Sequence, residues 1–217
     1  MIRASIVAMT IAIGTAGCTS GLHSDEPAVE TYVLRATGTA SPAAANPLPS
    51  LRVQRPLAAP GLDTERIVLM QADHRSSYYA GSRWAARLPE VVQALAVERF
   101  RATGAWSSVE DARLSIPAHY LLEITVRRFD ADYTAQPGAP VVHVSLDCAV
   151  VQRTDRELVT SFTAESSASA TENRLGAVVD AFERAANEAL ATAAERSAAA
   201  VRTSKVRSPP AGDSSSS

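Results

Sequence analysis

The chain has 217 residues, with 21 Lys and Arg against 23 Asp and Glu, so its formal net charge is only -2 at pH 7. No basic block accompanies this balance, which disfavours a nucleic-acid-binding protein. Aromatic residues make up 5 % of the chain. Ala and Val carry much of the apolar content, which favours helices packed closely on a modest sheet. A chain of this length holds one domain with tails or two small domains.

The N-terminus has the architecture of a signal peptide. Residues 1–17 contain a single positive charge, Arg3, followed by an apolar run over residues 4–13 and a small-residue exit. The run is too short to cross a hydrocarbon layer of ~30 Å. We therefore expect residues 1–17 to be a signal peptide and residues 18–30 to form a polar tether.

Cys18 is the expected lipidation site. The small residues before it resemble the bacterial lipobox, at which the cysteine is acylated, for example with palmitate, and becomes the mature N-terminus. Thr15 stands where a lipobox usually has a bulky aliphatic residue, so an ordinary secretory signal remains the alternative. Several acyl chains would hold the protein stably at a membrane while its domain stays in water. The residue after the cysteine is Thr19 rather than Asp, which, by resemblance to the known sorting rules of diderm bacteria, favours the inner leaflet of the outer membrane, facing the periplasm.

The first half of the chain combines short strands with one helix. Residues 31–36 and 51–57 alternate like strands, and residues 37–50 between them have no periodicity and predict a mobile loop. From Leu88 onward, the apolar positions recur at the spacing of a helix. This pattern predicts an amphipathic helix over residues 88–103, with Gln93 on its outer side.

Three large aromatic residues precede that helix. Residues 66–70 form a short apolar run typical of a buried strand, and Tyr78, Tyr79 and Trp84 follow in a polar linker. They either form a lid over the core or make an exposed patch that docks a partner, because Tyr and Trp supply contact area at low entropic cost. The sequence leaves both interpretations open.

The second half predicts three strands and a helix. Residues 120–133, 141–153 and 157–168 alternate apolar and polar positions and are joined by turns, which indicates an antiparallel meander. The first of these strands loses its alternation past Arg128, so we expect a bulge there. A stripe of apolar residues at helical spacing then predicts a helix over residues 171–199.

Together these elements predict an α/β (α+β) sandwich in which a small, mainly antiparallel β-sheet is covered by two amphipathic helices. The folded domain is expected over residues 31–199. Residues 200–217, rich in Lys, Arg, Ser and Pro, are expected to form a disordered tail. A domain of this size buries about two-thirds of its unfolded surface, which is enough without disulfides.

No residue is predicted to be catalytic or to bind a metal or cofactor. The chain has two cysteines, and one is the expected lipid site, so no disulfide is expected. The other, Cys148, lies on the apolar face of its strand, which favours an inert buried thiol. No nucleophile elbow or phosphate-binding loop occurs. A hydrolase triad assembled across the fold stays open as an alternative. The histidines lack the short helical spacing of a metal site, and they are His23, His74, His119 and His143.

Two stretches carry a family resemblance. RPLAAPGLDTERIVLM (residues 55–70) and YYAGSRWAARLPEVVQAL (residues 78–95), together with the opening Tyr32-Val33-Leu34, resemble the ABC-type transport auxiliary lipoprotein family, best known from the PqiC (YmbA) lipoproteins. The resemblance covers residues 32–194.

The resemblance implies both a fold and a function. It implies a sandwich with two helices, without catalytic residues or a cofactor. Members of this family work with an ABC transporter and a mammalian-cell-entry (MlaD-like) periplasmic protein to move lipids between the envelope membranes. They can also form rings, so the resemblance further implies a homo-oligomer. The alternative is a structural lipoprotein that assembles another outer-membrane machine.

Overall fold

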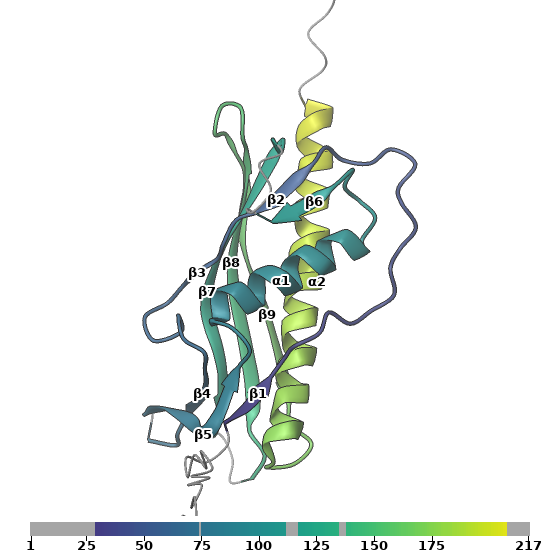
Figure 1. Ribbon diagram of the computed structural model, residues 1–217. Helices are drawn as coiled ribbons and strands as arrows, with labels where there is room; N and C mark the ends of the chain where they lie inside the picture. Colours follow the sequence, from purple (N-terminus) through teal and green to yellow (C-terminus); the bar gives the residue numbers. More distant parts are fainter. Residues whose placement is uncertain (1–28, 74, 112–116, 135–137, 208–217) are drawn as a thin grey trace, which may run out of the picture.

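The computed structural model describes residues 29–73, 75–111, 117–134 and 138–207. In this part of the chain, nine strands form one mixed sheet, and two helices pack on the same face of it (Figure 1). The strands are β1 (Glu30–Tyr32), β2 (Leu51–Val53), β3 (Leu57–Ala58), β4 (Arg66–Met70), β5 (Ser76–Trp84), β6 (Val109–Asp111), β7 (Tyr120–Asp132), β8 (Val141–Gln152) and β9 (Leu158–Ser169), and the helices are α1 (Leu88–Ala102) and α2 (Leu175–Arg207).

Strand β7 is the centre of the sheet. On one side it pairs along its whole length with antiparallel β8. On the other side it pairs in parallel with β2 near its start, with β3 in its middle and with β4 at its end. The α+β class is therefore as predicted, but the sheet is larger than expected and mixed rather than mainly antiparallel.

The meander β7–β8–β9 confirms the predicted alternation. Every second residue of β8 from Val142 to Val150 is buried against the helices, including Cys148. The predicted bulge lies between Val126 and Arg128 of β7, where the register with β8 shifts. This extra residue keeps the apolar side chains of both halves of β7 on the helix side.

The two helices contact each other and close the core. Helix α2 runs along β8 and β9, and α1 crosses in front of it (Figure 1). The last turns of α2, residues 200–207, were expected to belong to a disordered tail. They continue the helix instead, and Val201 is fully buried in the core. The interpretation of Gln93 was wrong: it is only 8 % exposed, and its Nε2 donates a hydrogen bond to the Val53 carbonyl oxygen at 3.1 Å.

The loop over residues 37–50 was expected to be mobile, and the structure instead fastens it to the C-terminal end of α1. The Ser41 amide donates to the Ala102 carbonyl at 2.7 Å and the Ala44 amide to the Gly104 carbonyl at 2.9 Å. Gly104 has a φ of 60°, and a Cβ there would lie 2.4 Å from the Pro42 carbonyl oxygen. Glycine thus both ends the helix and lets the loop approach.

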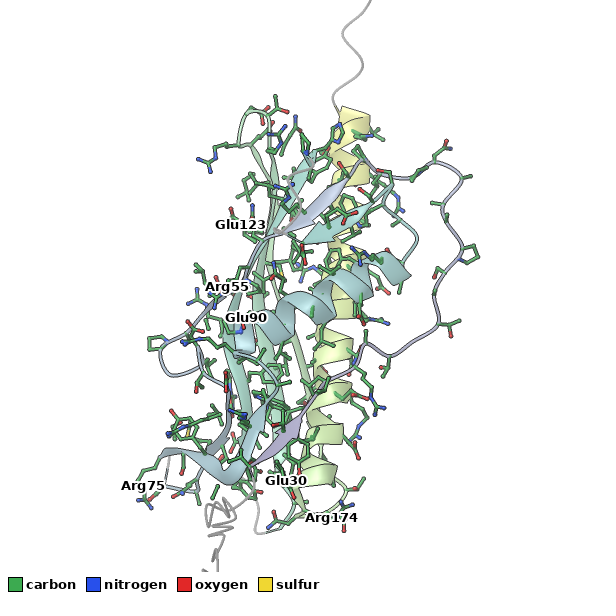
Figure 2. The ribbon with its side chains drawn as sticks, in the orientation of Figure 1. Glu30, Arg55, Arg75, Glu90, Glu123 and Arg174 are labelled. Carbon is green, nitrogen blue, oxygen red and sulfur yellow. The ribbon has the colours of Figure 1, made fainter. Side chains whose placement is uncertain are left out.

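The face of the sheet opposite the helices is polar. Glu123, labelled in Figure 2, is exposed on this side. Arg127 of β7 pairs with Asp147 of β8 at 2.5 Å, and the Thr163 hydroxyl of β9 donates to the same carboxylate at 2.8 Å. Both contacts hold the pKa of Asp147 below its usual range. Among the described residues, no helix is both long enough and apolar enough to cross a membrane.

Candidate functional site

The predicted linker between residues 70 and 88 is in fact strand β5, which leads through a tight connection into α1. Three backbone amides fasten this junction: Trp84 donates to Glu65 at 2.7 Å, Ala85 to Tyr32 at 2.9 Å and Leu88 to Thr64 at 3.0 Å. Strands β1 and β4 are therefore held on either side of β5. The candidate site is built on this framework.

Charged side chains surround the junction. Arg87 Nε donates to Asp63 Oδ1 at 2.9 Å, and its Nη2 donates to the Asp63 carbonyl oxygen at 2.6 Å. Arg55, which lies beside Glu90 in Figure 2, is 3.5 Å from both the Asp63 and the Glu90 carboxylates. The Arg87 guanidinium lowers the pKa of Asp63. Because these groups are about half exposed, each pair adds little stability, and the network mainly orients the loop before β4.

Trp84 is not part of an exposed patch. Only 1 % of its surface is exposed, and its ring meets Phe129 and Phe182 edge-on, with centroids 6.1 and 5.3 Å away. Those two phenylalanines stack on each other at 5.1 Å. Trp84 thus joins β5 to β7 and α2 inside the core. Of the two interpretations offered by the sequence, a lid over the core and an exposed docking patch, the first describes Trp84.

Tyr79 is half buried and belongs to a short chain of hydrogen bonds. Its hydroxyl lies 2.8 Å from the Tyr133 hydroxyl, which donates to Asn173 Oδ1 at 2.8 Å. Burial, followed by the contact with Tyr133, raises the pKa of Tyr79. The Tyr79 phenol therefore stays protonated and ties β5 to the end of β7.

Tyr78 is the member of the predicted trio that offers a surface. It is 38 % exposed, and the Arg66 guanidinium lies 4.9 Å from its ring centroid, at cation–π distance. Both residues line an open groove of about 700 Å³ along β5. The groove also contains Val29, Arg83 and the Asp63–Arg87 pair.

A second groove lies beside α1. It has a volume of about 680 Å³ and an apolar lining that includes Val33, Ala85, Ala86 and Val91. The small alanines leave the hollow, and Val33 is largely exposed on its wall. Neither groove was foreseen from the sequence, because each joins segments that are far apart along the chain.

The remaining candidate residues do not assemble with these grooves. Burial raises the pKa of the Cys148 thiol to about 12, so this cysteine is buried and protonated at neutral pH, as the pattern predicted. His119 Nδ1 lies 2.9 Å from Ser50 Oγ, and His143 is 4.0 Å from Asp132. In the described ranges, no three His, Cys, Asp or Glu side chains are grouped to hold a metal.

Several sequence predictions concern residues outside the described part of the chain. They are the signal peptide, the lipidation site Cys18, the tether up to residue 28 and the tail over residues 208–217. His23 and His74 also lie outside it. The absence of catalytic, metal and cofactor roles remains a prediction.

The fold and the grooves define an α+β domain with open, shallow surfaces. The family model described as "ABC-type transport auxiliary lipoprotein component" matches residues 32–194. The chain therefore belongs to the ABC-type transport auxiliary lipoprotein family, among its PqiC-like (YmbA-like) members. This is a family of bacterial envelope lipoproteins, and its description associates it with an ABC-type transport system.

Solved structures agree with this assignment. A Xanthomonas campestris protein of family DUF330 superposes with a TM-score of 0.73 at 25 % identity, covering 81 % of this chain and 98 % of its own. An uncharacterized protein superposes with a TM-score of 0.59 at 13 % identity, covering 79 % of this chain and 97 % of its own, and shares the fold alone. A search of curated proteins finds no match.

Proposed function

We infer that this protein is a lipid-anchored adaptor in intermembrane lipid transport. In this role it contacts a mammalian-cell-entry (MlaD-like) protein and its ABC transporter from the periplasmic side of the outer membrane. The observation that carries the proposal is the family match, which spans most of the chain and names an auxiliary component of ABC-type transport. The domain acts by contact and carries no catalysis of its own.

The anchor in this proposal is Cys18. The signal-like run before it and the small residues next to it support acylation. Anchoring leaves the domain in water, because each buried CH₂ of an acyl chain contributes ~0.8 kcal/mol and two or more chains suffice for stable attachment. Labelling with palmitate tests this directly. Failure to label the wild type, with Cys18→Ala still sedimenting with membranes, would contradict it.

The contact surface in this proposal is the groove along β5. Tyr78 and Arg66 together supply an aromatic face and a cation at an open strand, and both residue types are enriched among binding hot spots. The side chains deeper in the same strand, Trp84 and Tyr79, hold the surface in place from below.

A pull-down from detergent-solubilised membranes tests the partner. We expect the wild type to recover a mammalian-cell-entry protein, Tyr78→Ala to lose most of it, and Tyr133→Phe to retain it as a control at a structural tyrosine. Recovery of another outer-membrane assembly alone would favour the structural lipoprotein instead. Hydrolytic activity that depends on His119 or Ser50 would favour the envelope hydrolase.

A further inference from the structure

The groove beside α1 has the lining of a hydrocarbon site. Its walls come from the end of β1 and the residues after it, from the connection between β5 and α1, and from the first half of α1. Val33 is 63 % exposed and Leu34 only 6 %, so the groove runs from an exposed apolar wall down to the core. Apolar hollows of this size with a few polar groups are the usual form of a small-molecule site.

The volume of the groove is too large for one side chain of a partner. It measures about 680 Å³. A cavity of ~150 Å³ is enough to hold a benzene ring, so a phenyl-sized group would fill roughly a quarter of the groove. At that packing, the groove has room for a hydrocarbon chain of ~16 carbons.

The apolar walls make their hydrogen bonds within the protein. The Ala85 amide donates to the Tyr32 carbonyl at 2.9 Å, and Gln93 Nε2 donates to the Val53 carbonyl at 3.1 Å. A peptide segment laid along these walls would lose water from its N–H and C=O groups without gaining partners, which opposes binding. A hydrocarbon chain carries no such groups, so the lining favours it over a peptide.

The charged part of the lining is the pair of Arg55 and Glu90, which lie side by side in Figure 2. Their side chains are 45 % and 46 % exposed, and Arg55 Nη2 is 3.5 Å from Glu90 Oε1. This is longer than the ~2.7–2.9 Å of a tight charge-assisted bond. Arg55 Nε and Nη1 donate to no residue in the described ranges. Such a loose, exposed pair opens easily and then presents a positive and a negative group next to each other.

We propose that the groove beside α1 binds a phospholipid that has one hydrocarbon chain and a zwitterionic head. The chain lies along the apolar walls, the phosphate accepts hydrogen bonds from Arg55, and the ammonium group of the head pairs with Glu90. A head with only negative charge would gain Arg55 but be repelled by Glu90 and by Asp63, which is also 3.5 Å from Arg55. The site shares no lining residue with the β5 groove, and it does not depend on the proposed transport partner.

Photo-crosslinking on the full chain as processed, reconstituted into phosphatidylglycerol vesicles, tests the proposal. The probe is lysophosphatidylethanolamine with a diazirine on its acyl chain, and mass spectrometry locates the labelled residues. We expect labelling to concentrate on residues 32–34 and 85–94. Losing the contact of one CH₂ group is worth about fourfold in affinity, so Ala94→Trp, which fills the groove, should reduce labelling by about fivefold or more. Ala199→Trp, at an exposed alanine of α2 outside the groove, should leave it unchanged.

Competition with unlabelled lipids provides the second measurement. An exposed ion pair is worth up to roughly fivefold in affinity, so lysophosphatidylethanolamine should compete about threefold better than lysophosphatidylglycerol or hexadecanol. Glu90→Gln should abolish this preference, and Arg55→Gln should weaken labelling by about threefold. Arg75→Gln, at an exposed arginine paired with Asp73, is the matched control and should change neither result.

Equal labelling of the wild type and a folded Ala94→Trp, or labels spread over the exposed surface, would overturn the proposal. Equal competition by all three lipids in the wild type would overturn it as well, and this second outcome is decided without the groove-filling variant. No partner protein is present in the vesicles, so neither outcome bears on the transport contact, which the pull-down tests separately.

Discussion

Replacing Trp84 with Ala separates a core residue from a docking residue. The ring is 1 % exposed and meets two phenylalanines edge-on at 6.1 and 5.3 Å. Truncation of a buried aromatic side chain costs about 3–5 kcal/mol, of which each edge-to-face pair accounts for roughly 0.5–1.5 kcal/mol. Since domains are stable by about 5–15 kcal/mol in total, Trp84→Ala should remove roughly a fifth or more of the free energy of unfolding.

Urea denaturation followed by circular dichroism measures this loss, with Tyr78→Ala as the matched control. Tyr78 is more than a third exposed, so its truncation is expected to cost less than about 1 kcal/mol, as surface substitutions do. A loss below ~1 kcal/mol for Trp84→Ala, or an equal loss for both variants, would refute the assignment of Trp84 to the core.

Further predictions concern the loop contact, the buried thiol and the open face. Gly104→Ala should destabilise the domain by about 1–2 kcal/mol, because residue 104 has a left-handed backbone conformation, and by more because the added Cβ pushes Pro42 away. Urea denaturation measures this loss. A neutral effect would contradict the close approach of Pro42 to Gly104. With the other cysteine replaced, Cys148 should react with a thiol reagent only after denaturation, because its pKa is raised to about 12; rapid reaction of the native chain would place the thiol at the surface. The lowered pKa of Asp147 beside Arg127 means that this carboxyl stabilises the fold above its unfolded pKa, and that the stabilisation is lost as pH falls through the lower folded pKa. Asp147→Asn should therefore flatten the acid limb of a stability–pH curve below about pH 4, and an unchanged limb would assign acid sensitivity to other groups.

Strands with one dry face and one wet face could be predicted from sequence. In β8, Val142 and Val144 alternate with His143 and Ser145, and the alternation alone identifies the buried side. In contrast, β5 reads as a linker, because Gly81 with a φ of 65° and the irregular pairing of β4 with β5 interrupt its period. Local periodicity carries no signal where a strand bends.

Pairing partners were harder to predict than strands. The parallel contacts of β7 with β2, β3 and β4 involve only two or three residues each. Such short contacts leave no pattern in the sequence, and the mixed sheet was therefore missed. Gln93 was misplaced for a related reason: a polar side chain was read as exposed, while the Val53 carbonyl that satisfies it comes from a distant strand.

The candidate site was predicted in part, and its geometry explains why. The run from Trp84 to Leu88 that carries the family resemblance is mainly a structural junction, since its backbone amides hold β1 and the start of β4. A match at these positions therefore reports the fold. Tyr78 and Arg66 need not take part in that junction, so their side chains are free to set which partner the domain accepts. Differences in partner choice between proteins of this fold should accordingly lie along the β5 groove rather than in the Trp84 junction beneath it.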